Sequence, residues 1–179
     1  DGLLQNANLD YTDNGTTYTI ANWTLENSAK NTHVVINDDV LREDSHSIEF
    51  TDSNYITQTI AEISQSDNTI PYFAIVFARK TAAGSDGDII LTLGSQSETV
   101  DVATLSETDW TPITIGVGDE SGWYDNWKED GAEFKIEYNK DTTAGVEIGN
   151  IILAQPSAFD GLYYMLASMV TPFVSGDSF

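Results

Sequence analysis

The stretch Ser47–Ile60 constrains the fold most, because it reads as two short strands joined by a polar turn. Ile48 and Phe50 alternate with polar residues, which is the period of a strand that buries one face. The next four residues, Thr-Asp-Ser-Asn at 51–54, favour a turn. A second strand follows, with one face formed by Tyr55, Thr57 and Thr59. The stretch therefore predicts short strands in an antiparallel arrangement.

Similar strand patterns recur along the chain, separated by turn sequences such as Asp13-Asn14-Gly15, and almost no helical period is present. Roughly ten short strands with polar turns favour a β-sandwich over a parallel α/β sheet. Tyr72–Arg79 is apolar on both faces, which predicts a central strand. The expected strands are Thr17–Trp23, His33–Asn37, Ser47–Phe50, Tyr55–Ile60, Tyr72–Arg79, Asp88–Leu93, Glu98–Val102, Thr111–Val117, Glu133–Tyr138 and Val146–Leu153.

Composition sets limits on the class of protein. The 179 residues are 40% hydrophobic, which is enough for the core of one domain. Seven Lys and Arg against 29 Asp and Glu give a net charge of −22, so we expect no nucleic-acid partner. No apolar run is long enough to span a bilayer, and we expect no membrane insertion. Without cysteine the chain has neither disulfides nor thiolate metal sites, and the redox compartment stays open.

The character of the sequence changes after Pro156, where aromatic and methionine residues concentrate. We therefore divide the chain into a sandwich over residues 1–155 and a docking or oligomerisation segment over residues 156–179. One helical face would carry Leu162, Met165, Leu166 and Met169, whereas a strand would alternate Tyr163, Met165 and Ala167. The segment either packs on its own sandwich or contacts a partner. The contact candidates are Tyr163, Tyr164, Met165, Met169 and Phe173.

Several short motifs occur in the order found in one known family. They are Asn6-Ala7-Asn8-Leu9, Trp23-Thr24, Ser47-Ile-Glu-Phe50 with Tyr55-Ile-Thr-Gln58-Thr-Ile60, Tyr72–Arg79, Leu105–Trp110 and Ile148-Gly149-Asn150-Ile151. In this order they resemble the carbohydrate-binding-module jelly roll, which is related to galactose-binding-like sandwiches. The resemblance covers about residues 3–154 and implies an all-β, antiparallel β-sandwich of jelly-roll type with an apolar C-terminal extension.

The resemblance also implies a calcium site at the closing and opening motifs. In the family an Asp of the closing motif often holds this ion, and here that position is Gly149. Oxygen ligands would then come from Asn6, Asn8, Asn150 or backbone carbonyls, with fewer charges than calcium sites usually have.

A cluster of aromatic residues, Trp123, Tyr124 and Trp127, lies among acidic residues and glycines in an expected loop. Sugar rings stack on indole faces, so this cluster is the candidate carbohydrate-binding platform. The alternative is that these rings cap the core or fill a subunit contact. Trp23 and Trp110 occupy positions that the resemblance assigns to packing, and we expect both side chains in the core.

No catalytic constellation stands out, so we expect the protein not to be an enzyme. His33 and His46 share no metal-ligand spacing, and neither a nucleophile elbow nor a phosphate loop is present. Asp86-Gly87-Asp88 could ligate calcium, although a polar hairpin turn is the simpler interpretation.

Modules of this type occur in glycoside hydrolases and in phage tail, fibre and capsid-decoration proteins. We therefore expect a non-enzymatic virion structural protein of a tailed phage, a capsid decoration, neck, tail or fibre component. It would contact other virion proteins and further copies of itself, and would be located in the virion. The alternative is a secreted carbohydrate-binding module or host-glycan adhesin that contacts cell-surface glycans.

Overall fold

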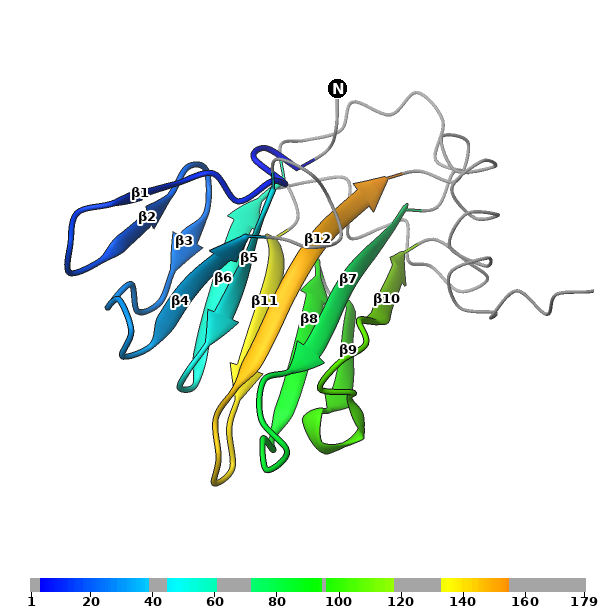
Figure 1. The fold of residues 1–179 in the computed structure, drawn as a ribbon. Coiled ribbons are helices and arrows are strands. Elements are labelled where there is room, and N and C mark those ends of the chain that lie inside the picture. The colour runs from blue at the N-terminus through cyan, green and yellow to red at the C-terminus, as the bar shows by residue number, and fades with distance from the viewer. Residues whose placement is uncertain (1–3, 39–44, 61–71, 95, 118–132, 155–179) are drawn as a thin grey trace, which may run out of the picture.

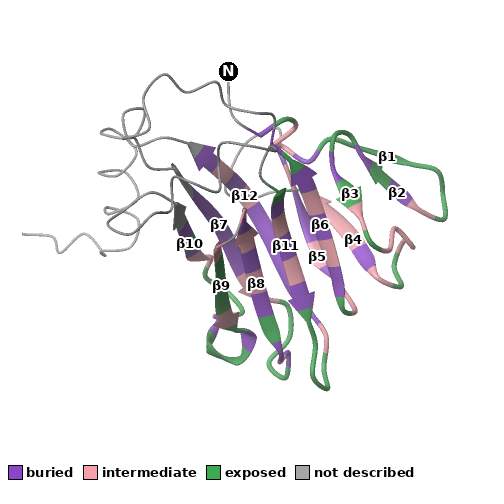
Figure 2. Ribbon diagram, turned by 180° about the vertical axis from the view of Figure 1, so that it is seen from behind, coloured by how far each residue is buried: buried purple, intermediate pink, exposed green. Residues whose placement is uncertain are grey.

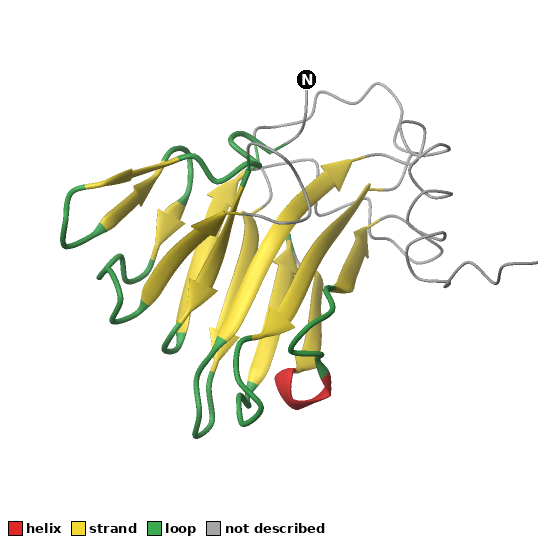
Figure 3. Cartoon of the chain, in the orientation of Figure 1, coloured by secondary structure: helices red, strands yellow, loops and turns green. Residues whose placement is uncertain are grey.

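The computed structural model describes residues 4–38, 45–60, 72–94, 96–117 and 133–154. Twelve strands and one short 3-10 helix, Val102–Thr104, make up the regular structure of these residues. No helix in these ranges is long and apolar enough to cross a membrane. The strands form two layers that face each other, with a small hairpin at one side (Figures 1 and 3).

The first sheet has five antiparallel strands in the order β10-β7-β12-β5-β4. These strands are β10 (Thr111–Val117), β7 (Tyr72–Lys80), β12 (Val146–Ala154), β5 (His46–Phe50) and β4 (Val34–Asp38). The second sheet has the order β3-β6-β11-β8-β9. Its strands are β3 (Thr24–Leu25), β6 (Asn54–Thr59), β11 (Glu133–Asn139), β8 (Asp88–Leu93) and β9 (Gln96–Asp101).

The path of the chain between the two sheets is that of a jelly roll. From β5 to β12 the chain alternates between sheets, except that β8 and β9 form a hairpin within one sheet. The first sheet therefore carries β5, β12, β7 and β10 side by side, and the second carries β6, β11, β8 and β9. This arrangement is the double Greek key that defines the jelly roll, and the predicted fold class is confirmed.

For nine of the ten expected strands, both ends agree with the structure to within two residues. The exception is the first, Thr17–Trp23, which corresponds to the shorter β2 (Tyr18–Ile20). Two strands were not expected, β1 (Tyr11–Asp13) and β3. β1 pairs with β2 as a separate hairpin, and all three of its residues are exposed. A strand of three exposed residues has no apolar alternation, so its sequence carries no periodic signal.

Alternation within each strand sorts side chains between the core and the outer faces. In β6, Asn54, Ile56 and Gln58 are buried. Tyr55, Thr57 and Thr59 share one face, as predicted, and this face is the outer one. The largest fully buried side chains of the core cluster are Tyr138, Phe50, Phe134, Leu9, Ile20, Ile48, Ile56, Ile60, Ile89, Leu91, Leu93 and Ile136.

β7 is a central strand, as its sequence predicted. It pairs with β10 on one side and with β12 on the other. Ala74, Val76 and Ala78 point into the core cluster. Ile75 and Phe77 point to the opposite face and are nevertheless only 3% exposed. Both faces of β7 are therefore buried.

Two loops at one end of the sandwich are tied together by Asp86. Its carboxylate accepts hydrogen bonds from the backbone N–H groups of Thr142 and Thr143, each at 2.8 Å, and from the Thr142 hydroxyl. These bonds, that of the Thr142 hydroxyl first, lower the pKa of the Asp86 carboxyl. The Tyr138 hydroxyl donates to the Asp86 carbonyl oxygen at 2.7 Å. Asp86 therefore works as a loop anchor, and its carboxylate is already occupied by donors.

Candidate functional site

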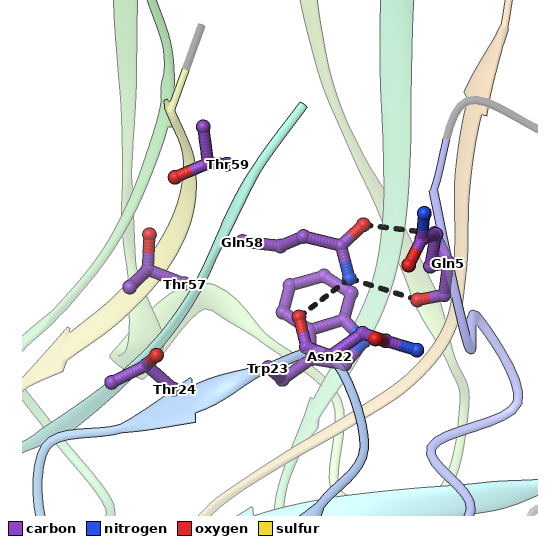
Figure 4. Close-up of a pocket in the computed structure, with 7 residues that line it drawn as sticks. All are labelled: Gln5, Asn22, Trp23, Thr24, Thr57, Gln58 and Thr59. Carbon is purple, nitrogen blue, oxygen red and sulfur yellow. Dashed lines mark hydrogen bonds between the residues drawn. The ribbon is translucent and has the colours of Figure 1, made fainter. Parts of the chain in front are cut away.

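A polar hollow lies on the second sheet, where β3 meets β6 and the segment that precedes β1. Its volume is about 490 Å³, inside the range of roughly 300–1,000 Å³ that small-molecule sites occupy. Figure 4 shows the side chains around it. Among the described residues its lining consists of Gln5, Asn22, Trp23, Thr24, Thr57, Gln58 and Thr59.

Gln58 forms the fixed part of this hollow. Its Oε1 accepts a hydrogen bond from the backbone N–H of Gln5 at 2.8 Å. Its Nε2 donates to the carbonyl oxygens of Gln5 at 2.8 Å and of Asn22 at 2.9 Å (Figure 4). One side-chain amide on β6 therefore holds two separate backbone segments in place, and the wall of the hollow is preorganised.

Trp23 packs next to Gln58 in the same wall of the hollow. It is 7% exposed and belongs to the core cluster, and its ring meets that of Phe134 edge-on with centroids 6.1 Å apart. Its Nε1 donates to the carbonyl oxygen of Asn6 at 3.0 Å. The predicted packing role of Trp23 is confirmed, and its ring offers little free area for stacking.

Four other lining residues are exposed, and their polar side chains form no hydrogen bond within the described part of the chain. They are Gln5, Asn22, Thr24 and Thr59. Asn22 has a φ of 65°, a left-handed conformation that Asn tolerates better than most residues. These carboxamides and hydroxyls are therefore free to bind a ligand from solvent.

The hollow opens onto the outer face of the second sheet. Thr57 lies opposite Thr24 on β3 and opposite Lys135 on β11, and the same row continues to Thr92 and Ser97. Hydroxyl side chains therefore run across the sheet with one interruption. At that interruption the Lys135 ammonium pairs with Glu137 at 2.6 Å and lies 4.5 Å from the centre of the Tyr55 ring.

Charge distinguishes the hollow from the rest of the protein. Every lining residue within the described ranges is neutral, although the chain has a net charge of −22. Neutral amides and hydroxyls bind ligands through hydrogen bonds in both directions, as donors and as acceptors. The chemistry of the site therefore suits a neutral ligand with many hydroxyl groups and gives no advantage to an ion.

Several predicted site residues cannot be placed here. Trp123, Tyr124 and Trp127 lie outside the described residues, as do Tyr163, Tyr164, Met165, Met169 and Phe173. The carbohydrate-binding role of the first set and the contact role of the second set stay predictions.

The three asparagines of the expected calcium site are in the described ranges, and Asn6 and Asn150 have other structural roles. The Asn6 Oδ1 accepts from the Asp10 N–H at 2.9 Å, while its Nδ2 donates to the carbonyl oxygens of Asp10 and Ala21. Asn150 stands at an irregularity in β12 with a φ of 46°. None of the three brings a carboxylate. The set therefore fits a divalent cation poorly, and calcium binding stays a prediction without a further ligand.

Trp110 corrects one expectation. It lies outside the core cluster and is only partly buried, and the Arg79 guanidinium stacks 4.6 Å from the centre of its ring. Its buried indole N–H has no hydrogen-bond partner among the residues that the structure describes. Trp110 therefore packs on the outer side of the first sheet instead of between the sheets.

The histidines do not form a site in the described ranges. His33 Nδ1 lies 3.7 Å from Asp52 Oδ2, whereas His46 meets the Tyr11 ring edge-on at 5.0 Å. No group of three or more His, Cys, Asp or Glu side chains close enough to hold a metal ion occurs among the residues described.

The hollow was not predicted, although one signal was available. Gln58 stands between Ile56 and Ile60 at a core-facing position, and a polar residue there requires partners. Its partners, Gln5 and Asn22, are far from it in sequence and could not be identified without the fold.

Comparisons with known proteins agree on the sandwich. No family model matches the sequence, and no curated protein matches it. Among solved structures, a cyclase from Fischerella sp. TAU in complex with 4-(1H-indol-3-yl)butan-2-one is 13% identical, with a TM-score of 0.53. That match covers 81% of this chain and 88% of the cyclase chain. The likeness concerns the fold.

Two further solved structures match this chain with lower TM-scores. A family 61 carbohydrate-binding module in complex with β-1,4-galactotriose is 15% identical with a TM-score of 0.47, covering 75% of this chain and 89% of the module. The enzymatically active domain of tailspike protein 4 from bacteriophage CBA120 is 20% identical with a TM-score of 0.41, covering 75% of this chain.

This chain spans 19% of the tailspike chain and 23% of the chain of an arabinose-bound α-L-arabinofuranosidase.

Proposed function

We propose that this protein is a non-catalytic carbohydrate-binding module whose site is the hollow between β3, β6 and the Gln5 segment. The observation that carries the proposal is the neutrality of this hollow on a strongly acidic protein. A glycan supplies hydroxyls that both donate and accept hydrogen bonds, which is what the free groups of Gln5, Asn22, Thr24 and Thr59 require.

The row of hydroxyl side chains beyond Thr57 supports a ligand of several sugar units. Adjacent strands lie about 4.8 Å apart, so the row from Thr24 to Ser97 crosses five strands and about 19 Å of sheet. A linear oligosaccharide lying across the strands would meet a hydroxyl side chain on each strand of the row except β11, where Lys135 stands. Trp123, Tyr124 and Trp127 remain the candidates for stacking on such a ligand.

The experiment is a glycan-array screen of the intact chain, followed by calorimetric titration of the strongest neutral hit. Asn22→Gly removes one carboxamide from the hollow, while glycine tolerates the φ of 65° at that position. The matched control is Asn31→Gly, an exposed asparagine with a φ of 61° that lies outside the hollow.

Loss of one or two ligand hydrogen bonds predicts a Kd raised about 3- to 30-fold in Asn22→Gly and unchanged within error in Asn31→Gly. Binding of a glycan that is equally strong in both variants would contradict the assignment of the hollow. Absence of any glycan binding would contradict the function itself.

The virion role expected from the sequence stays a prediction, as do a virion location and contacts with other virion proteins. A glycan-binding appendage on a virion would satisfy both this prediction and the proposed activity. We expect no catalysis, and turnover of a polysaccharide by the purified chain would overturn that expectation.

A further inference from the structure

Side chains on the outer face of the first sheet are buried where solvent exposure would be normal. One face of an antiparallel sheet in a two-layer sandwich packs on the core, and the other is usually solvated. Ile75 and Phe77 lie on the outer face of β7 and are each 3% exposed, although neither belongs to the core cluster. Figure 2 shows β7 and β12 coloured as buried over long stretches.

The same face buries a charged group. Glu147 on β12 has a side chain only 4% exposed, and Ser47 on β5 is fully buried. Glu147 Oε2 accepts from Arg79 Nε at 2.7 Å and from Nη2 at 2.6 Å, while Oε1 accepts from Ser47 and from Asn37. A carboxylate removed from water needs such partners. The complete set of donors indicates that this face is built to be covered.

The burial of this outer face ends at the edge of the sheet. Thr114 on β10 lies directly opposite Ile75 in the strand pairing, yet it is exposed. The buried part of the face is therefore a strip over β7, β12 and β5, which we call the covered strip and define by Ile75, Phe77, Glu147 and Ser47.

We propose that the covered strip is the docking surface of the chain's own segment 156–179. β12 ends at Ala154, which pairs with Phe73 of β7, so the last described residue before the segment belongs to the first sheet. Its only charged residues are Asp160 and Asp177, and it carries apolar residues at the i, i+3, i+4, i+7 spacing of a helical face. These residues are Leu162, Met165, Leu166 and Met169, defined here as the apolar stripe.

Docking of the apolar stripe on Ile75 and Phe77 would remove both apolar surfaces from water, and burial of apolar surface is favourable. It would also make the two outer faces of the sandwich different in role. The first sheet would be occupied by the chain itself, while the second sheet, with the hollow, would stay open. This proposal stands independently of the carbohydrate-binding proposal.

Thiol labelling can test this directly, because the chain has no cysteine. We would place one thiol by Ile75→Cys, in the covered strip, and measure its reaction with a maleimide in the full chain. Thr114→Cys supplies an exposed reference on the same face, and Ile48→Cys supplies a reference inside the core. Each is measured with the natural segment and with a segment in which all four residues of the apolar stripe are changed to serine.

With the natural segment, the Ile75→Cys thiol should react at least ~10-fold more slowly than the Thr114→Cys thiol. With the changed segment, the rate for Ile75→Cys should rise to within ~3-fold of that for Thr114→Cys, while the rate for Ile48→Cys stays low. Fast labelling of Ile75→Cys in both chains, or slow labelling in both, would overturn the proposal. Protection that disappears on dilution would assign the strip to a second copy of the chain and would also overturn it.

If the Ile48→Cys thiol also becomes reactive, the changed segment has loosened the sandwich, and a second measurement decides. A photo-crosslinking residue at Thr114 in the otherwise natural chain should link to residues 156–179 of the same molecule. Links between two molecules, or links only to other parts of the chain, would contradict the proposal.

Discussion

Gln58 and Gln5 form two reciprocal hydrogen bonds, in which the Gln5 N–H donates to Oε1 and Nε2 donates to the Gln5 carbonyl oxygen, both at 2.8 Å. The side-chain amide thereby pairs with the backbone as a neighbouring strand would. The N-terminal segment depends on this contact for its position, and the hollow depends on the segment for one wall.

Replacement of Gln58 by leucine should therefore destabilise the protein and deform the hollow. The change leaves one backbone N–H and two carbonyl oxygens without partners, which predicts a loss of about 2 kcal/mol in the free energy of unfolding. Urea denaturation followed by fluorescence measures it. Gln96→Leu is the matched control, because the Gln96 side chain makes no hydrogen bond in the described structure, and we expect a change below about 0.5 kcal/mol.

The Arg79–Glu147 ion pair should behave as a buried pair. Arg79→Met leaves the Glu147 carboxylate buried with only Ser47 and Asn37 as partners, which predicts a loss of about 3 kcal/mol. The double variant Arg79→Met/Glu147→Leu should be more stable than Arg79→Met alone, since it removes the stranded charge. A double variant as unstable as the sum of both single changes would show that the pair contributes little coupling.

Two glycines with similar backbone angles predict very different costs for alanine. Gly87 has a φ of 96°, and a Cβ there would lie 2.1 Å from the Asn139 carbonyl oxygen. Gly15 has a φ of 93°, with nothing within 4 Å of its Cβ position. Gly15→Ala should cost about 1 kcal/mol from backbone strain alone, and Gly87→Ala at least about 2 kcal/mol more. Equal thermal midpoints for the two variants would contradict the predicted clash between a Cβ at position 87 and the Asn139 carbonyl oxygen.

Because of Tyr138, the free energy of unfolding should decrease as the pH becomes alkaline. Burial raises the pKa of its hydroxyl to about 12, so the folded state holds the proton more tightly than the unfolded state does. Its contribution is complete below pH 10 and is lost as the pH rises from about 10 to about 12, by on the order of 2 kcal/mol. Tyr138→Phe should flatten this decline in urea midpoints while lowering stability at pH 7, because the bond to Asp86 is lost.

Asp86 should make the stability of the protein decrease as the pH falls into the acid range. Hydrogen bonds from Thr142 and Thr143 lower the pKa of its carboxyl, so its contribution is present above the ordinary Asp pKa and is lost as the pH falls below about 4. Asp86→Asn should therefore reduce the fall in thermal midpoint between pH 5 and pH 3. An unchanged acid profile would mean that other carboxyl groups control it.

Many of the strands could be predicted from the sequence because apolar and polar residues alternate along them, as Ile48 and Phe50 do in β5. β7 could be predicted for a different reason, because its sequence is apolar on both faces, as a central strand requires. β1 and β3 escaped detection because strands of two or three residues are too short to show a period. Their position depends on pairing with β2 and β6.

The hollow was beyond prediction because its parts are brought together by topology. Gln5, Asn22 and Gln58 are 17 and 36 residues apart along the chain. Trp110 was misassigned for a similar reason. Its sequence shows an aromatic residue before a strand, but only the fold places it against Arg79 on the outer side.

The measurement that tests the central claim most directly is an NMR titration of the intact chain with neutral oligosaccharides of galactose, xylose and glucose. The Gln58 carboxamide and the Trp23 indole N–H report on the hollow, and the Trp110 indole N–H reports on the opposite sheet. We predict saturable shifts of the first two signals and none of the third. Shifts confined to Trp110, or no saturable shift at Gln58 with any bound sugar, would contradict the assignment of the hollow as the glycan-binding site.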